Sequence, residues 1–244
     1  MSRRLDGGSP RAQAPAWTAP ERGTARIVIK LGGAVAAQSA GTVLALAEEN
    51  EVCVVHGAGE QITLEMVRAG IPVRFVGGRR VTSPEALEVV RNSFAEVGAA
   101  LCAALGSRAE QLFGDEIGLP ATLVPELGLV GDPLPSAPEA VVQALAAGRI
   151  PVVAPLAAGP LNVNADEAAA ALAQGLEAER LLFLTDVDGL ILNGEVVDEI
   201  DAGDATELLD RALLEGGIVP KLRAAVTAAQ AGVPATIGRT VVVA

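Results

Sequence analysis

Two lysines stand out in this chain because the other 16 of its 18 Lys and Arg residues are arginines. Lys30 ends an apolar run and precedes a glycine pair at 32–33, and Lys221 follows a glycine pair at 216–217. A lysine ammonium is a compact, strongly hydrated point charge, which suits a phosphate better at such a position than a planar guanidinium does. Chance survival of two surface lysines is the alternative. The pattern favours a phosphate site with both lysines as its cations.

A second glycine turn, His56-Gly57-Ala58-Gly59, ends another apolar run and precedes a helical pattern. Glycines let the backbone approach a ligand and aim its amides inward, and a helix N-terminus favours negative charge. Neither a P-loop nor a G-x-G-x-x-G fingerprint is present. A tight crossover turn remains the simpler alternative. His56 has the chemistry of a general base, but a structural role is the more frequent one at a buried strand end.

Polar residues also gather at three further points. Capping by Asn164 or Asp166 explains only one polar residue of 162–166. Asn162 is then available to bind a substrate amino or amide group, and Asp166 to fix two ammoniums. Residues 185–189 lack the later ligands of an EF-hand loop, so a nucleotide-contacting turn fits them better. Arg79-Arg80 follows a Gly-Gly bend, where it is either a carboxylate fork or a solvated basic pair.

The elements that position these groups alternate between apolar β-branched runs and alanine-rich helical stretches. A hairpin is expected within 71–83, and a long helix is capped by Ser83 with Pro84 at its first position. Strands joined by helical crossovers predict an α/β fold: a three-layer αβα sandwich with a mostly parallel open sheet. Ligands bind such sheets at the carboxyl ends of the strands. The predicted strands span 26–31, 51–55, 121–124, 151–154 and 181–185, and the predicted helices 42–49, 61–69, 84–105, 138–147, 166–176, 205–214 and 221–231.

Composition narrows the function classes. The 244 residues are 50% hydrophobic but 2% aromatic, and the net charge of -12 argues against nucleic-acid binding through a broad basic face. No apolar run is long enough for a membrane span, and the single histidine argues against a Cys/His metal cluster. Cys53 and Cys102 read as reduced thiols of a cytoplasmic protein. Residues 1–25 lack the apolar core of an export signal and are expected to form a disordered tail, with a misplaced start codon as the alternative.

Taken together, these motifs resemble the amino-acid kinase family, and within it the acetylglutamate branch. The matching segments are Lys30-Leu-Gly-Gly, His56-Gly-Ala-Gly, Gly78-Arg-Arg-Val-Thr, Asn162-Val-Asn-Ala-Asp, Thr185-Asp-Val-Asp-Gly and Gly216-Gly-Ile-Val-Pro-Lys.

The resemblance implies a phosphotransferase that uses ATP and Mg²⁺ to phosphorylate the γ-carboxylate of N-acetyl-L-glutamate, a step of arginine biosynthesis. It implies that Mg²⁺ is held mainly by phosphates, with no metal-ligating residue. Residues 26–160 would form an N-terminal lobe for substrate binding and dimerisation, and 161–244 a shortened nucleotide lobe. The implied site residues are Lys30, Lys221 and Asp166 for catalysis; Ala58, Gly59, Arg80 and Asn162 for the acyl amino acid; and Gly32, Gly33, Asp186, Gly189 and Gly217 for the nucleotide.

Three departures from the family pattern carry expectations. Ala58 stands where the family usually has a glycine. The alanine methyl group is tolerated there only if the backbone φ at position 58 is negative. The stretch after Lys221 is short, which bears on ATP affinity. The 1–25 segment does not resemble the N-terminal helix of arginine-inhibited hexamers, so an arginine-insensitive homodimer paired through the helix after Ser83 is expected. A kinase for another acyl or carrier-linked amino acid, or a non-catalytic ligand-binding or regulatory member with a degraded nucleotide lobe, are the alternatives.

Overall fold

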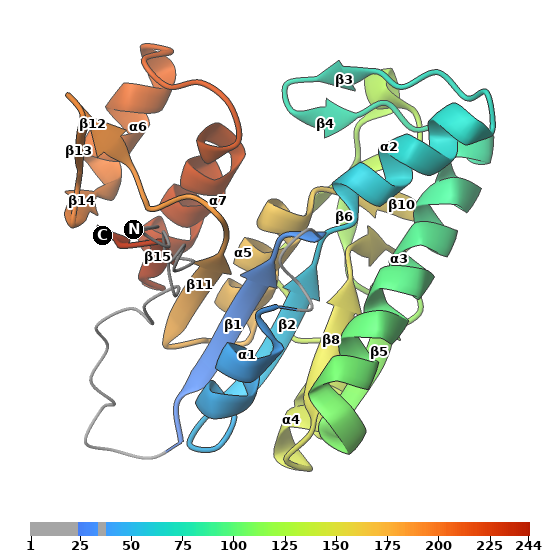
Figure 1. The fold of residues 1–244 in the computed structure, drawn as a ribbon, viewed down its shortest axis with the longest axis horizontal. Coiled ribbons are helices and arrows are strands. Elements are labelled where there is room, and N and C mark those ends of the chain that lie inside the picture. Colours follow the sequence, from blue (N-terminus) through green and yellow to red (C-terminus); the bar gives the residue numbers. More distant parts are fainter. Residues whose placement is uncertain (1–23, 34–37) are drawn as a thin grey trace, which may run out of the picture.

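The computed structural model describes residues 24–33 and 38–244, so most of the predicted 1–25 tail lies outside it. Its centre is an eight-stranded sheet of order β14-β16-β15-β11-β1-β2-β8-β5 (Figure 1). All neighbours in it pair parallel except the antiparallel β15 and β16. These strands are β1 (Arg26–Leu31), β2 (Glu51–His56), β5 (Ala109–Phe113), β8 (Ile150–Ala154), β11 (Arg180–Leu184), β14 (Glu199–Asp201), β15 (Ala235–Ile237) and β16 (Thr240–Val243).

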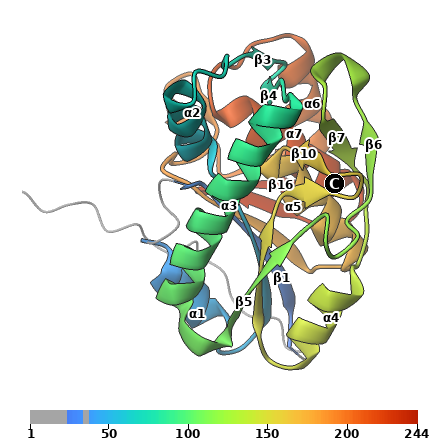
Figure 2. The ribbon, with the colours of Figure 1, turned by 90° about the vertical axis from the view of Figure 1, so that its right-hand side faces the viewer.

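Helices cover both faces of this sheet, as Figure 2 shows from the side. One face packs against α4 (Glu139–Ala146), α5 (Ala165–Gly175) and α7 (Ile218–Gln230), and the other against α1 (Ala40–Leu46) and α3 (Pro84–Leu105). Two more helices pack on these: α2 (Gly59–Arg68) on α3, and α6 (Ala202–Asp210) on α7. The predicted three-layer α/β sandwich is therefore confirmed. No helix in the described part of the chain is long and apolar enough to cross a membrane.

Smaller elements surround the carboxyl end of the main sheet. A four-stranded sheet has the order β6-β7-β10-β9, and the hairpins β3–β4 and β12–β13 stand apart from it. The strands are β3 (Phe75–Val76), β4 (Arg79–Arg80), β6 (Ala121–Leu123), β7 (Val130–Pro133), β9 (Leu156–Ala157), β10 (Leu161–Val163), β12 (Ile191–Leu192) and β13 (Glu195–Val196), and the 3₁₀ turns are Gly106–Arg108 and Pro125–Leu127.

The pleat of β1 decides which face receives its reactive group. Successive side chains of a strand point to opposite faces. Ile27, Ile29 and Leu31 pack in the apolar cluster with α1 and α3, whereas Val28 packs in the cluster with α5. Lys30 shares the parity of Val28 and therefore points toward α5, the helix that carries Asp166.

Two local predictions hold in detail. The long helix spans Pro84–Leu105, and Ser83 caps it by accepting a hydrogen bond from the Ala86 N–H at 3.2 Å. The β3–β4 hairpin turns at a glycine pair with φ of 56° at Gly77 and 80° at Gly78. Positive φ at both central residues defines a type I′ turn, whose twist matches the flanking strands.

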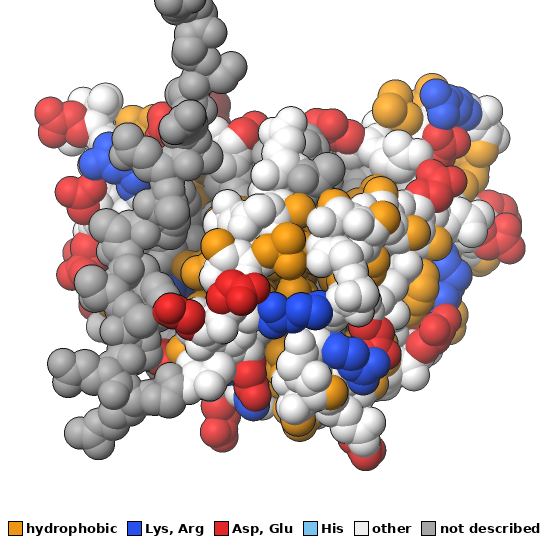
Figure 3. Space-filling model, turned by 60° about the horizontal axis from the view of Figure 1, so that its bottom comes forward, with side chains coloured by type: hydrophobic (Ala, Val, Ile, Leu, Met, Phe, Trp, Pro, Cys, Tyr) orange, Lys and Arg blue, Asp and Glu red, His pale blue; other side chains and the backbone are white. Residues whose placement is uncertain are grey.

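The division into lobes at residue 160 stays a prediction, because the main sheet runs through both predicted lobes. On the face drawn in Figure 3, acidic and basic side chains are interspersed between apolar atoms.

Candidate active site

A buried ion pair joins the first strand to α5. The Lys30 Nζ lies 2.8 Å from the Asp166 Oδ1, and the two side chains are only 8% and 7% exposed. Lys30 is the penultimate residue of β1, and Asp166 is the second residue of α5. Two buried charges are tolerated when they compensate each other, and removing either partner leaves the other charge buried and unpaired. The structure thus brings together two residues that the sequence placed in separate motifs.

Lys221 completes this cluster from the first turn of α7. Its Nζ lies 3.9 Å from Asp166 Oδ2 and 3.4 Å from the carbonyl oxygen of Gly217, to which it donates. Burial lowers the pKa of Lys221 below its usual value; Asp166 partly offsets this, whereas the charge of Lys30 lowers the pKa further. One carboxylate therefore holds two ammoniums, one on each oxygen. The result is a cationic site built for an anion.

A cavity of about 210 Å³ opens beside this cluster. Its walls come from the turn after β2, the β3–β4 hairpin, β10 and the start of α5. Seven predicted site residues line it: Lys30, Gly33, Ala58, Gly59, Arg80, Asn162 and Asp166.

The two glycine turns touch each other at the carboxyl ends of β1 and β2. The Gly57 N–H donates to the carbonyl of Leu31 at 2.9 Å, and a Cβ on Gly33 would lie 3.0 Å from the Gly57 carbonyl oxygen. Ala58 is the N-cap of α2 with φ of -142°, so its methyl group causes no backbone strain. Gly59 opens α2, and its amide lies in the electropositive first turn of that helix.

Arg80 is a buried cation without an acidic partner among the described residues. Its guanidinium donates to the Gly59 carbonyl at 3.0 Å and the Thr63 hydroxyl at 2.9 Å, and it stacks on Phe75 with 4.6 Å to the ring centroid. Burial lowers the pKa of Arg80. A buried, cavity-lining guanidinium of this kind can receive a ligand carboxylate in its fork.

The Asn-x-Asn-x-Asp segment divides its work among three side chains. Asn164 is the N-cap of α5 and accepts from the amides of Asp166 at 2.8 Å and Glu167 at 3.3 Å. Asn162 is buried and donates through Nδ2 to the Thr82 hydroxyl at 3.0 Å, which leaves its Oδ1 for a ligand N–H. Capping therefore belongs to Asn164, and Asp166 is free for the lysines. Thr82 ends the Gly78-Arg-Arg-Val-Thr segment, but the sequence assigned it no role; the structure shows that it supports Asn162.

The residues predicted to contact a nucleotide are more dispersed. Gly32 follows β1, Gly217 is the exposed N-cap of α7, and Asp186 is exposed after β11 but close enough to raise the pKa of Lys221. Gly189 is buried at φ 144°, where a Cβ would lie 2.6 Å from Thr240 Oγ1. Close packing alone therefore accounts for Gly189, and its nucleotide contact stays a prediction.

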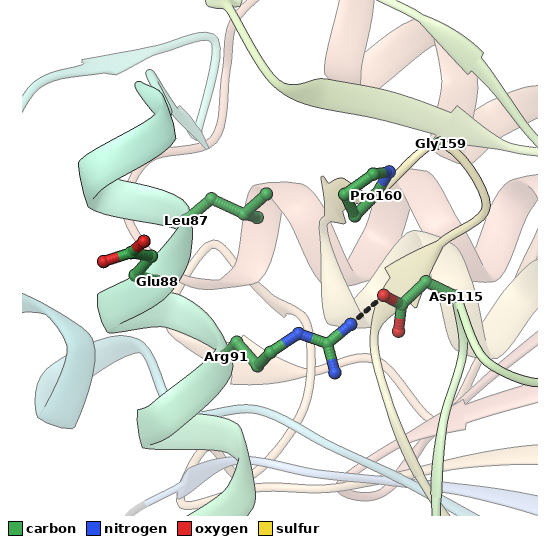
Figure 4. Close-up of a pocket in the computed structure, with 6 residues that line it drawn as sticks. All are labelled: Leu87, Glu88, Arg91, Asp115, Gly159 and Pro160. Atoms are coloured by element: carbon green, nitrogen blue, oxygen red, sulfur yellow. Dashed lines mark hydrogen bonds and ion pairs between the residues drawn. The ribbon is translucent and has the colours of Figure 1, made fainter.

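A second cavity of about 300 Å³ lies away from both lysines (Figure 4). It is bounded by Leu87 and Arg91 of α3 and by Pro160 before β10, with Leu87 and Pro160 pointing toward one another. Arg91 is paired there with Asp115 and, at 3.0 Å, with Glu116. The cationic cluster therefore identifies the smaller cavity, not this one, as the candidate active site.

No group of three or more His, Cys, Asp or Glu with metal-binding geometry occurs among residues 24–33 and 38–244. Both oxygens of Asp166 face lysines. The donor set of the site thus fits an anion carried in with its own cation better than a metal held by the protein.

Comparison with known proteins adds independent evidence. Residues 25–239 match the amino acid kinase family. The chain is 44% identical over 202 residues to an acetylglutamate kinase of Nocardia farcinica. The match covers 74% of this chain and 66% of that protein, so this chain spans just under two thirds of the length of that relative. It is 41% identical over 221 residues to an acetylglutamate kinase of Rubrobacter xylanophilus, with 86% and 87% covered.

A solved structure agrees: smu.665 from Streptococcus mutans UA159 superposes with a TM-score of 0.82 at 30% identity, covering 89% of this chain and 98% of that one. The site geometry and these matches lead to one conclusion: the chain belongs to the amino acid kinase family, and the two relatives compared above are named acetylglutamate kinases.

Proposed function

We propose that this protein transfers the γ-phosphoryl group of ATP to the γ-carboxylate of N-acetyl-L-glutamate, in arginine biosynthesis by the acetylated route. The observation that carries the proposal is the buried Lys30–Asp166 pair, joined by the partly buried Lys221, beside a cavity lined by Arg80. The choice of N-acetyl-L-glutamate as the substrate rests on the relatives that are named acetylglutamate kinase.

The chemistry needs no general base, because a carboxylate is already a nucleophile. Two anions must be aligned, and the negative charge spread over the transferring phosphoryl group must be neutralised. Lys30 and Lys221 approach from different elements and supply two ammoniums for that charge. Asp166 fixes both, so their positions need no rearrangement during the reaction. Mg²⁺, bound through phosphate oxygens, would add further charge neutralisation.

The residues that bind the acyl amino acid line the rest of the cavity wall. Arg80 grips the α-carboxylate, since it is a buried guanidinium with no acidic partner among the described residues. The Oδ1 of Asn162 accepts the acetamido N–H, and the amides of Ala58 and Gly59 donate to the anions. On the other side, Gly32, Gly33, Asp186, Gly189 and Gly217 contact ATP.

Two further parts of the proposal concern the whole molecule. The protein acts as a homodimer paired mainly through the outer face of α3, where Ala99, Ala100 and Ala103 are exposed. It works in the cytoplasm, where its unpaired Cys53 and Cys102 stay reduced. Light scattering tests the dimer, and a thermal shift with ATP alone tests nucleotide binding by the shortened lobe.

The activity is tested with ATP, Mg²⁺, N-acetyl-L-glutamate and hydroxylamine, which traps an acyl phosphate as its hydroxamate. N-acetyl-L-aspartate and free glutamate serve as substrate controls. Lys221→Arg keeps the charge but replaces the ammonium, so turnover should fall by about 100-fold. Arg223→Lys, at an exposed position on the same helix, should leave it unchanged. Absence of hydroxamate with the wild-type protein would overturn the proposal.

A further inference from the structure

Arg79, the neighbour of the cavity arginine, makes three contacts with two elements outside its own hairpin. Its Nε and Nη2 donate to Glu167 Oε1 at 3.2 and 3.0 Å, and its Nη1 pairs with Asp132. Glu167 is the third residue of α5, directly after Asp166, and Asp132 lies in β7. The Arg79 side chain is 26% exposed, so these pairs are partly shielded from water.

Besides Arg79, the hairpin is held by Arg80, which donates to Gly59 and Thr63 of α2, and its own strand pairing is short. Strands β3 and β4 form only two residue pairs, Phe75 with Arg80 and Val76 with Arg79. The side chains of Phe75 and Val76 are exposed. An isolated two-stranded hairpin is at best marginally stable in water. Contacts to the body of the protein must therefore fix its position.

Strand alternation gives the two arginines different partners. Adjacent side chains point to opposite sides of a strand. Arg80 turns toward α2, where it reaches Gly59 and Thr63, and Arg79 turns toward α5 and β7. Any rotation of β4 that released Arg79 would therefore also move the guanidinium of Arg80.

We propose that Arg79 is a positioning residue, whose ion pairs with Glu167 and Asp132 lock the β3–β4 hairpin onto α5 and β7 and thereby hold Arg80 in its place for the substrate carboxylate. This inference rests on the proposed function, since it assigns Arg80 a carboxylate ligand.

Charge balance at the start of α5 strengthens the inference. Glu167 is mostly buried and stands next to Asp166, the carboxylate that serves the two lysines. Without Arg79, the negative charge of Glu167 would have no cationic partner from the hairpin. It would then repel anionic substrates and compete with them for the ammoniums of the two lysines.

The decisive comparison is between Arg79→Leu and Arg74→Leu. Arg74 is exposed just before the same hairpin, so its loss changes the charge equally without touching Glu167 or Asp132. In Arg79→Leu, the KM for N-acetyl-L-glutamate should rise by about ten-fold, with the KM for ATP changed by less than about two-fold. Arg79→Lys retains one charge-assisted bond and should recover part of the loss. Arg74→Leu should match the wild type.

Hydrogen exchange tests the lock without any substrate. Amides of residues 75–81 should exchange at least several-fold faster in Arg79→Leu than in the wild type or Arg74→Leu, while those of α3 stay unchanged. Glu167→Gln combined with Arg79→Leu should give less than the sum of the single effects. Unchanged hairpin exchange in Arg79→Leu, or an equal rise in KM in Arg74→Leu, would overturn the inference. A wild type that makes no hydroxamate refutes the proposed activity instead, and exchange still decides whether the lock exists.

Discussion

Acidification should destabilise this protein through His56, the chain's single histidine. The ring lies at the end of β2, is fully buried, and packs edge-to-face on Phe94 with 5.8 Å between centroids. A Cβ on Gly98 would lie 3.0 Å from its Nε2. Burial lowers the pKa of His56 from 6.5 to about 4, and the backbone of Gly57 offsets part of this effect.

The sign of the effect follows from proton linkage. In the unfolded chain the imidazole takes up a proton below pH 6.5, whereas in the folded protein it does so only near pH 4. The free energy of unfolding therefore keeps the full His56 contribution above pH 6.5 and loses it progressively down to about pH 4. The difference between the two pKa values corresponds to about 3 kcal/mol, at roughly 1.4 kcal/mol for each factor of ten.

Two measurements check this reasoning. With one histidine, its NMR signal can be followed through a pH titration without assignment, and it should not titrate near 6.5. Urea unfolding from pH 7.5 to 5 should show a steeper loss of stability in the wild type than in His56→Leu, by up to about 1.4 kcal/mol per pH unit. A histidine signal that titrates normally, or equal pH slopes in both proteins, refutes the argument.

Three further outcomes are expected. Asp166→Asn should lower turnover by about 100-fold because two ammoniums lose their common anchor, whereas Asp210→Asn on the surface of α6 should not; near-normal turnover would remove Asp166 from the site. Gly114→Ala should lower the free energy of unfolding by about 2 kcal/mol or more, measured in urea, because the new Cβ would lie 1.9 Å from the Leu156 carbonyl oxygen. Burial raises the pKa of Cys53 to about 12, so fewer than two thiol equivalents of the native protein should react with a disulfide reagent until urea unfolds it; two equivalents that react rapidly would contradict the argument that Cys53 is a buried, protonated thiol.

Much of the fold could be predicted because its signals are local. The strand at 26–31 and the helix at 84–105 appear with the predicted bounds, since β-branched runs and a Ser-Pro helix start act over a few residues. The short strands β5, β7, β9, β10, β12, β13, β14, β15 and β16 were not predicted. Their two to five residues carry too little periodicity, and long-range pairing, such as Val163 with Gly131, stabilises them.

The candidate active site was likewise predictable from the sequence only in part. Residue types identified Lys30, Asp166 and Lys221, but only the fold shows that one carboxylate serves both ammoniums. The sequence left open whether Asn164 or Asp166 caps α5, because both side chains suit that position. It also could not tell the roles of Arg79 and Arg80 apart, since these depend on which side of β4 faces the cavity.

The parity of Lys30 in β1 has a consequence for how the chain assembles. A β1 paired one residue out of register would direct this ammonium to the α1–α3 side, into the apolar cluster of Val54, Leu101 and Leu105. A charge stranded there would cost several kcal/mol, far more than a displaced valine or leucine. The ammonium that neutralises the phosphoryl charge therefore also helps to fix the register of β1, because it makes the misaligned sheet less stable than the correct one during folding.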